Sequence, residues 1–442
     1  MNPTNPFFKR VAVLGAGASG VAAARLFAAE GASVTVLDTA SPESLVDRAL
    51  ELADLGIALE TGATALQVPE GTTLAVLSPG IDQASEQVRA FIDAGIPLTG
   101  ELEAAFARCL CPVVAITGTN GKTTTTQLIE AMFNAAEVST RACGNIGPAF
   151  SAHVGESKTL AALTVEVSSF QLETIAKFRP KIAVWLNFAP DHLDRYPSMR
   201  EYYEAKVRIF ENQTEEDWAV VNVRDTLPAL RAQTLTFSAY VDSGDFALLD
   251  GVITFRGEPI LRMADTHLRG LHNAENLMAA LATGRAWGLA WKAMLPALCA
   301  YRALPHRCEL VGCVDGVDYV NDSKATNLDA VEKALASESR SVVLIAGGKD
   351  KGFEFGAITA LVTGRCRRAV LIGEMAARIQ SEWGDALPCE RATDLAEAVE
   401  LARKAAQPGD VVLFSPGTSS FDMFKNYADR GNQFRALVQN LS

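Results

Sequence analysis

The sequence lacks several features that would place it at once in a large class of proteins. Its 442 residues contain no uncharged apolar run of 18 or more, so no membrane-spanning helix is expected. Positive charge is not in excess, and the formal net charge of −12 argues against a binder of nucleic acid or of anionic membranes. The eight cysteines form neither a CxxC pair nor a cysteine–histidine metal spacing, which predicts the reduced thiols of a cytoplasmic protein.

Internal repeats and low-complexity segments are also missing. The length predicts about two to four globular domains, and an apolar content of 49% is enough for several cores. Lys9-Arg10 and the apolar run after them imitate the start of a secretory signal peptide. Three glycines at turn spacing, followed by the charges of Arg25 and Glu30, instead favour a folded α/β segment.

A glycine-rich turn follows the first predicted strand, residues 11–14. The turn, Gly15-Ala16-Gly17-Ala18-Ser19-Gly20, fits the GxGxxG pattern, and a helix over 21–29 and a strand over 33–37 lead to Asp38. A nicotinamide dinucleotide site and a Rossmann-like site for another diphosphate both fit this pattern. Asp38 suits a ribose or base edge in either case. A second nucleotide loop further along the chain favours the other diphosphate.

That second loop is the strongest motif of the chain. A short apolar strand over 113–116 leads into Gly118-Thr119-Asn120-Gly121-Lys122-Thr123, and a helix with an apolar stripe follows. The glycines let the backbone approach a phosphate, the helix N-terminus offers free N–H groups, Lys122 adds a positive charge and Thr123 can reach Mg²⁺. Ile116 stands where the strict Walker pattern has its first glycine. The loop predicts binding of a nucleoside triphosphate.

Two residues after this loop are candidate metal ligands. Glu166 interrupts an apolar strand over 160–167, which is costly unless the carboxylate is paired or binds a cation. A magnesium ligand is favoured over a paired buried acid, because the phosphate loop needs the metal. His192 lies between Asp191 and Asp194, just beyond a strand over 182–187. An ordinary surface histidine and a ligand near the phosphate loop are equally compatible with that position.

Lys206 is a candidate of a different kind. On the predicted helix 201–210 it shares a stripe with Tyr202, Tyr203 and Phe210 rather than with the polar residues. One interpretation is a lysine whose ammonium reaches back to solvent. The alternative is an inward-facing amine that is chemically converted or neutralised by an anion.

The remainder of the chain alternates strands and helices. A hairpin is predicted between Phe246 and Leu261, a long helix begins at Leu271, and Pro305-His306-Arg307 marks a boundary. In the last segment, polar clusters follow the predicted strands, which are residues 319–320, 342–346, 369–372 and 411–414. Ligands of α/β sheets bind at such strand ends. We therefore expect an α/β protein with a Rossmann-like domain (1–100), a central P-loop domain (101–304) and a C-terminal Rossmann-like domain (305–442).

These motifs, in this order, resemble the Mur ligase superfamily, and the resemblance spans all three predicted domains. The segments that carry it are Thr117–Thr124, Glu166–Glu173, Asp191–Tyr196, His272-Asn273, Leu304–Arg307, Asn321–Asn327 and Ser420–Tyr427. Phe421–Tyr427 with Arg430-Gly431-Asn432 resembles the D-glutamate-adding member in particular. The Asp-Asn-Pro-Arg motif of the diaminopimelate- or lysine-adding relative is absent from the third domain.

The resemblance implies an ATP-dependent ligase of peptidoglycan synthesis that joins D-glutamate to UDP-N-acetylmuramoyl-L-alanine through an acyl phosphate. The implied catalytic residues are Lys122, Glu166, His192 and Lys206. The implied ATP-binding residues are Gly118, Thr119, Asn120, Gly121, Lys122, Thr123, Thr124, Asn276, His306, Arg307, Asp322 and Lys324.

Two Mg²⁺ ions are also implied. Thr123 and Glu166 hold one of them, and His192 and a carbamylated Lys206 hold the other. The UDP-substrate residues implied are Ala18, Ser19, Asp38, Thr39, Ser78, Gly80 and Asn145. The D-glutamate residues implied are Thr326, Lys351, Ser420 and Tyr427.

The resemblance further implies a cytoplasmic monomer with small-molecule substrates, no nucleic acid partner and no membrane insertion. Closure of the last domain over ATP is expected about a hinge at Leu304–Arg307. Three alternatives stay open at this point. They are a nicotinamide-dependent dehydrogenase, a P-loop NTPase switch or scaffold, and a relative that adds another amino acid.

Overall fold

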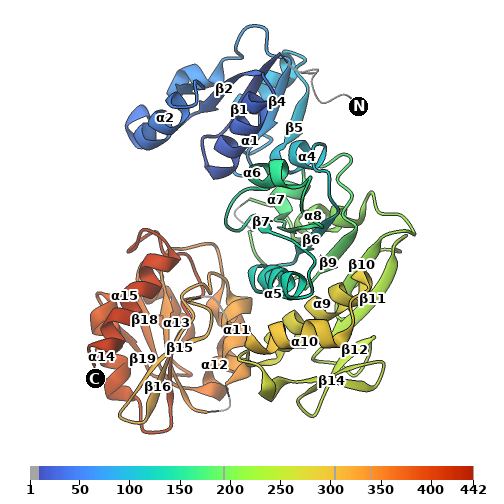
Figure 1. Cartoon of the computed structure of the whole chain (residues 1–442). Helices are drawn as coiled ribbons and strands as arrows, with labels where there is room; N and C mark the ends of the chain where they lie inside the picture. Colours follow the sequence, from blue (N-terminus) through green and yellow to red (C-terminus); the bar gives the residue numbers. More distant parts are fainter. Residues whose placement is uncertain (1–8, 193–194, 303–304, 339, 442) are drawn as a thin grey trace.

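The computed structural model describes residues 9–192, 195–302, 305–338 and 340–441, and it contains three sheets in series along the chain (Figure 1). In Figure 1 the first sheet lies at the top, the second occupies the centre and right, and the third lies at the lower left, beside α5 and α10. Leu193, Asp194 and Leu304, which fall in motifs named above, lie outside the described residues.

The first sheet has five parallel strands in the order β3-β2-β1-β4-β5. Its elements are β1 (Arg10–Leu14), α1 (Ala18–Ala29), β2 (Ser33–Asp38), α2 (Val46–Ala53), β3 (Ala58–Thr61), β4 (Leu74–Leu77), α3 (Glu86–Asp93) and β5 (Leu98–Gly100). The strand order reverses between β1 and β4, and a ligand crevice is expected at their carboxyl ends. Gly20 allows α1 to pack here, since a Cβ at this position would lie 1.9 Å from the Gly15 carbonyl oxygen.

The second sheet has nine strands in the order β14-β13-β12-β11-β10-β9-β6-β8-β7. Its strands are β6 (Val113–Thr117), β7 (Ala142–Gly144), β8 (Leu163–Glu166), β9 (Ile182–Trp185), β10 (Trp218–Asn222), β11 (Gln233–Ser238), β12 (Phe246–Leu249), β13 (Val252–Phe255) and β14 (Glu258–Arg262). The helices of this unit are α4 (Glu101–Phe106), α5 (Lys122–Ala135), α6 (Phe150–His153), α7 (Ser169–Leu172), α8 (Met199–Val207), α9 (Leu271–Trp287) and α10 (Trp291–Ala300). Strand β6 is buried at every position and apolar up to Ile116, as expected for a parallel strand covered on both faces.

The third sheet has six strands in the order β15-β16-β20-β17-β18-β19, and β15 pairs antiparallel with β16. Its strands are β15 (Glu309–Val314), β16 (Val317–Asn321), β17 (Val342–Gly347), β18 (Cys366–Ile372), β19 (Cys389–Arg391) and β20 (Val411–Phe414). Its helices are α11 (Leu328–Ser337), α12 (Thr359–Arg365), α13 (Ala376–Trp383), α14 (Leu395–Ala405) and α15 (Tyr427–Gln439). The neighbouring ends of β16 and β20 place Asp322 beside Ser415, which donates a 2.8 Å hydrogen bond to its carboxylate.

The predicted α/β class is confirmed, and most predicted strands are found within one or two residues of their predicted ends. The predicted hairpin is formed by β12 and β13, which pair antiparallel. The strand predicted over 160–167 is shorter, because the N–H groups of Ala161 and Ala162 both donate to the Ser139 carbonyl oxygen and bend the chain before Leu163. Across the described ranges, no helix is long and apolar enough to span a membrane.

Candidate active site

The glycine-rich loop between β6 and α5 has the geometry of a preformed phosphate cradle. Gly118 has φ 150° and Gly121 has φ 84°, in the region that favours glycine. The Lys122 ammonium folds back over the loop and donates to the carbonyl oxygens of Gly118 (2.9 Å) and Thr119 (2.8 Å). Burial lowers the pKa of Lys122. Asn187, after β9, braces the loop by accepting from the N–H of Asn120 at 2.9 Å.

Gly121 also lies against α9. A Cβ at this position would be 2.3 Å from the Asn276 side-chain oxygen. We expect Gly121→Ala to lower the unfolding free energy by about 1–2 kcal/mol and to weaken ATP binding by tenfold or more, because the loop must shift. Gly288→Ala is the matched control, since Gly288 has φ 93° and no described heavy atom within 4 Å of its Cβ position. Thermal unfolding and calorimetric titration with ATP test both variants, and unchanged ATP affinity in Gly121→Ala would contradict this account.

Glu166 lies at the mouth of this cradle. The register of β6 and β8 places it beside Ile116, and its side chain is only 3% exposed. One carboxylate oxygen accepts from the Asn145 side chain at 2.9 Å, and the other is buried without a hydrogen-bond partner in the part of the chain that the structure describes. A buried carboxylate oxygen without a donor favours a cation.

Residues with Mg²⁺-binding chemistry are therefore present, but not as a complete cage. No group of three or more His, Cys, Asp or Glu residues with metal-binding geometry occurs among the described residues. Mg²⁺ usually takes one or two carboxylates and completes its shell with phosphate oxygens and water. Glu166 beside a phosphate cradle fits that mode of binding.

Lys206, on α8, is 1% exposed and does not reach solvent. Its amine donates to the Gly118 carbonyl oxygen at 2.9 Å, which is the same oxygen that Lys122 contacts. Burial, and then the charge of Lys122, hold the pKa of Lys206 well below its ordinary value. The ring of Tyr202 lies 4.8 Å from the Lys206 nitrogen. The Lys206 side chain therefore faces inward and does not reach back to solvent, and its burial favours the neutral amine. The chemical conversion of the amine stays a prediction.

His192 has φ 56° and lies next to a buried carboxylate, that of Asp191. Asp191 joins the central and third units, because it accepts from the Asn327 side chain at 3.0 Å and from the Lys351 ammonium at 3.3 Å. Burial raises the pKa of Asp191, but His192, Lys351 and Asn327 outweigh this effect and lower it. Burial lowers the pKa of His192, which favours the neutral imidazole that metals bind.

A cleft lies between the phosphate loop and α9 on one side and the third unit on the other. Predicted ATP-binding residues that line it are Asn120, Gly121, Thr124, Asn276, Arg307, Asp322 and Lys324. The Nε atom of Arg307 is buried and has no hydrogen-bond partner within the described ranges, as expected for a group that awaits an anion. Burial raises the pKa of Asp322 to about 6.

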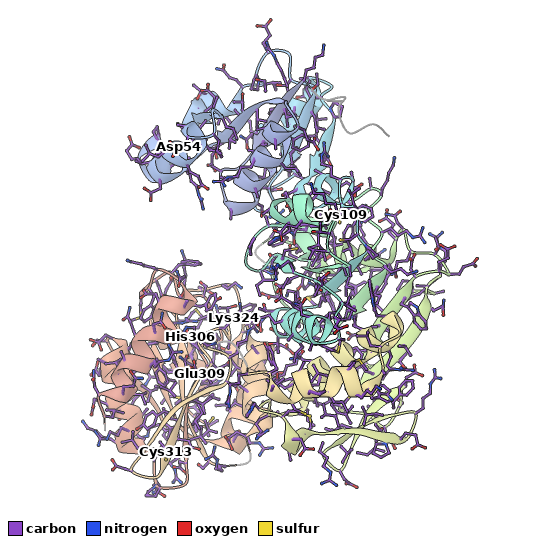
Figure 2. The ribbon with its side chains drawn as sticks, in the orientation of Figure 1. Asp54, Cys109, His306, Glu309, Cys313 and Lys324 are labelled. Carbon is purple, nitrogen blue, oxygen red and sulfur yellow. The ribbon has the colours of Figure 1, made fainter. Side chains whose placement is uncertain are left out.

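His306 and Lys324 lie at the edge of the third unit that faces α5 (Figure 2). The His306 ring is buried and lies 3.0 Å from the Asn321 side-chain nitrogen. Lys324 lies over the Tyr427 ring at 4.6 Å and donates to its hydroxyl at 3.2 Å. The structure therefore brings a predicted ATP-binding lysine into contact with a predicted D-glutamate residue.

Burial, reinforced by the charge of Arg307, lowers the pKa of Lys324 to about 8. The ammonium is present below that pH and is lost above it, so we expect ATP affinity to fall by up to about tenfold between pH 7 and pH 9. Lys324→Arg should flatten this dependence, because a guanidinium stays charged throughout the range. Calorimetric measurement of the Kd for ATP at several pH values tests this pH dependence. An equally steep fall of affinity in Lys324→Arg would show that another ionisable group is responsible.

The predicted UDP-substrate residues of the first unit gather at the carboxyl edge of its sheet. Ala18 and Ser19 begin α1, Asp38 ends β2 and is followed by Thr39, and Ser78 and Gly80 follow β4. Asp38 accepts from the Ala16 N–H at 2.8 Å, and the Ser78 hydroxyl donates to the Gly15 carbonyl oxygen at 3.2 Å. Asn145 belongs to the central unit, where it contacts Glu166.

The predicted D-glutamate residues lie on separate loops of the third unit. The Lys351 ammonium donates to the Thr326 carbonyl oxygen at 3.4 Å as well as to Asp191. Ser420 is buried and accepts from the Phe424 N–H at 2.9 Å through its backbone. Tyr427 begins α15, and its side chain contacts Lys324 and His306.

Four further residues shape the site and were not among the predicted ligands: Asn187, Asp191, Asp329 and Arg430. Asp329 accepts a hydrogen bond from the Asn120 side chain of the phosphate loop. Arg430 is fully buried and donates to Ser323 and to the carbonyl oxygens of Thr418 and Ser419, so it ties three loop residues of the third unit together. Asp191 and Arg430 lie inside motifs that carried the family resemblance, whereas Asp329 had no sequence signal.

Comparison with protein families agrees with this geometry. Residues 9–100 match the Mur ligase MurD-like N-terminal domain, 116–284 the Mur ligase middle domain, and 306–417 the Mur ligase glutamate ligase domain. The chain belongs to the Mur ligase family. Membership of a ligase family argues against the nicotinamide-dependent dehydrogenase among the alternatives above.

Relatives of similar length are named UDP-N-acetylmuramoylalanine–D-glutamate ligase. The chain is 44% identical to the UDP-N-acetylmuramoylalanine–D-glutamate ligase of Geobacter metallireducens, over 98% of both chains. It is 41% identical to the ligase of the same name from Pelotomaculum thermopropionicum, again over 98% of both.

Solved structures share the fold at low identity. The UDP-N-acetylmuramate–alanine ligase MurC of Thermotoga maritima has a TM-score of 0.64 and 18% identity, with 98% of this chain and 100% of that chain covered. The MurF ligase of the same organism, in complex with ADP, has a TM-score of 0.60 and 15% identity, with 93% and 96% covered.

Proposed function

We propose that this chain uses ATP to join D-glutamate to the carboxylate of UDP-N-acetylmuramoyl-L-alanine, a step of peptidoglycan synthesis. The observation that carries the proposal is an interdomain cleft with the phosphate loop on one side and Arg307, Asp322 and Lys324 of the third unit on the other. Glu166, with one unpartnered carboxylate oxygen among the described residues, lies at the end of the strand paired with the one that leads into this loop. The identity of 41–44% to full-length ligases of that name supports the choice of substrates.

The phosphates of ATP bind at the Gly118–Thr124 loop, where Lys122 and the N-terminus of α5 offset their charge. Arg307, Asp322 and Lys324 meet the nucleotide from the opposite wall of the cleft. Thr123 and Glu166 hold one Mg²⁺, and His192 and Lys206 hold a second. Bound Mg²⁺ supplies positive charge to the transferring phosphoryl group.

Lys206 serves as a metal ligand only after carbamylation. Its neutral amine adds to CO₂, a C–N bond forms, and one proton is released to leave an anionic carbamate. The observed environment supports this reaction, since burial and Lys122 already disfavour the ammonium form. A carbamate beside Lys122 is attracted to it, whereas two ammonium groups at one carbonyl oxygen repel each other.

The UDP part of the first substrate binds at the carboxyl edge of the first sheet, and its residues there are Ala18, Ser19, Asp38, Thr39, Ser78 and Gly80. Asn145 directs the muramoyl part toward Glu166. Thr326, Lys351, Ser420 and Tyr427 bind D-glutamate. In this assignment Lys351 exchanges the Asp191 carboxylate for a carboxylate of the amino acid, a like-for-like replacement.

The reaction follows from this placement. The substrate carboxylate attacks the γ-phosphorus of ATP, ADP leaves, and an acyl phosphate forms. The D-glutamate amine, in its neutral form, attacks the acyl carbon and a tetrahedral intermediate forms. Phosphate leaves with the electrons of the C–O bond, and the nitrogen loses one proton as the amide closes. The cleft contributes by holding three reactants in line and by excluding water from the acyl phosphate.

We also propose three domains, residues 1–100, 101–304 and 305–442. The division is supported by the order of the sheets along the chain, because the last strand of the first sheet ends at Gly100 and the first strand of the third sheet begins at Glu309. Residues 304–307 form the hinge of the third domain. We propose that the enzyme is cytoplasmic, since its eight cysteines are free thiols. We also propose that it acts as a monomer.

Phosphate release from ATP, measured with UDP-N-acetylmuramoyl-L-alanine and single amino acids of both chiralities, tests the proposal. Release that requires D-glutamate is expected. Release with another amino acid alone would keep the ligase reaction but refute the Lys351 and Ser420 assignments. Release that is independent of any amino acid would indicate an NTPase switch.

A further inference from the structure

One guanidinium group, that of Arg195, spans the interface between the first and central units. It donates to the carbonyl oxygens of Pro79 at 3.2 Å and Ile81 at 3.3 Å, and to the Glu173 carboxylate at 3.4 Å. It also lies over the ring of Phe170 at 3.9 Å. A planar guanidinium can meet two carbonyls and a carboxylate with its edge while it stacks on an aromatic face, and an ammonium cannot.

On the first-unit side, the two carbonyls flank Gly80 in the loop that follows β4. This loop carries two residues assigned to the UDP substrate, Ser78 and Gly80. The conformation of the loop is set by hydrogen bonds within the first unit. The Ser78 hydroxyl donates to the Gly15 carbonyl oxygen, and the Ile81 N–H donates to the Ser78 carbonyl oxygen at 3.0 Å. Arg195 therefore fixes where the loop lies relative to the central unit rather than how the loop folds.

On the central-unit side, the contacts of Arg195 lead to the metal site. Glu173 also accepts from the Tyr196 hydroxyl and from the side chain of Gln83 in the first unit, the latter at 3.1 Å. The Phe170 ring beneath the guanidinium packs against the His192 imidazole, with ring centres 4.8 Å apart. A shift of Arg195 thus moves the ring that supports a proposed metal ligand.

We propose that Arg195 is a positioning residue that sets the distance between the UDP-binding loop of the first domain and the reaction centre at Glu166 and His192. The inference rests on the proposed function, in which one substrate is held at the first domain and reacts in the cleft of the central domain. A substrate that is anchored at one end reacts only if its reactive end lies in the correct position at the reaction centre. A misplacement of about 1 Å can lower the rate about 10²-fold.

Arg108 provides a matched control, because it joins the same two units in a similar way. Its Nε atom pairs with Glu30 at 2.7 Å and its guanidinium lies over Phe27 at 4.2 Å, away from the UDP loop. Its neighbour Cys109 is labelled in Figure 2 at the junction of the first and central units. Arg108→Lys therefore perturbs the interface without touching the loop after β4.

The test compares Arg195→Lys, Arg195→Ala and Arg108→Lys in the full-length enzyme. We expect kcat to fall about 30-fold or more in both Arg195 variants, while the Kd for UDP alone, measured by calorimetry, changes by less than about threefold. The KM values for ATP and D-glutamate should stay within about twofold. Arg108→Lys should keep kcat within about twofold of the wild type.

Each outcome has one meaning. An unchanged kcat in Arg195→Lys, or an equal loss in Arg108→Lys, would overturn the positioning role. A UDP Kd that rises in parallel with the loss of kcat would make Arg195 a binding residue of the loop instead. If the wild type itself neither binds UDP nor ligates D-glutamate, the proposed function has failed rather than this inference. Thermal unfolding shows whether each variant is folded. If Arg195→Ala does not fold, the more conservative Arg195→Lys carries the test.

Discussion

Lys206→Ala is expected to reduce kcat for ligation by about 10³-fold or more, which corresponds to ~4 kcal/mol of lost transition-state stabilisation. The reason is that, in the proposed site, the Lys206 amine carries the carbamate that completes the second metal site. A small carboxylic acid, such as acetate at millimolar concentration, should enter the space left by the side chain. Part of the activity should return with it, because the carboxylate replaces the missing anion.

The control is Lys122→Ala, whose amine contacts the same Gly118 carbonyl oxygen. Lys122 is proposed to act as a cation, so its loss should be equally severe and should not respond to acetate. Lys206→Arg should be inactive as well, because a guanidinium does not form a carbamate. Full activity in Lys206→Ala, or rescue of both alanine variants by acetate, would contradict the carbamate.

Glu166→Gln is expected to lower kcat by about 10²- to 10³-fold and to raise the Mg²⁺ concentration for half-maximal activity by about tenfold. Glutamine keeps the shape of the side chain and the contact with Asn145, but its amide removes the charge of the oxygen that has no protein partner. Initial rates over a series of Mg²⁺ concentrations measure both effects.

Glu101→Gln is a close match for that substitution. Glu101 is also a buried acid with one carboxylate oxygen lacking a hydrogen-bond partner among the described residues, and the other oxygen accepts from the Ser151 N–H at 2.7 Å. Burial raises the pKa of Glu101, which shifts this carboxyl group toward its neutral form. We expect little change in Mg²⁺ dependence, and an equal change in both variants would show that buried charge, not metal binding, controls the rate.

Sequence reasoning succeeded where the chemistry of the site is local. The phosphate loop depends on residues within one turn, so its spacing alone predicted the strand, the glycine turn and the helix at Lys122. Lys206 was noticed because a helix repeats every 3.6 residues and its neighbours on that stripe were apolar or aromatic, although the pattern left open an ammonium that reaches back to solvent. Glu166 stood out because an acid in an apolar strand requires a partner.

The remaining features depend on how separate units meet. Lys351 contacts Asp191 across 160 residues of chain, and Asp329 contacts Asn120 across 209. No periodicity within one segment reports on such pairs. The role of Arg195 is harder still to predict from the sequence, because two of its hydrogen-bond acceptors are backbone carbonyl oxygens, which every residue has. Only the relative placement of the first two sheets shows what this guanidinium holds.

The most direct test of the central claim follows an oxygen atom of the substrate carboxylate. UDP-N-acetylmuramoyl-L-alanine labelled with oxygen-18 in its terminal carboxylate is incubated with the enzyme, ATP and D-glutamate, and the released phosphate is analysed by mass spectrometry. The account predicts that each phosphate carries one labelled oxygen, because the oxygen that bridges carbon and phosphorus leaves with phosphate. Unlabelled phosphate released together with the amide product would show that the carboxylate is not phosphorylated, and would contradict the acyl phosphate.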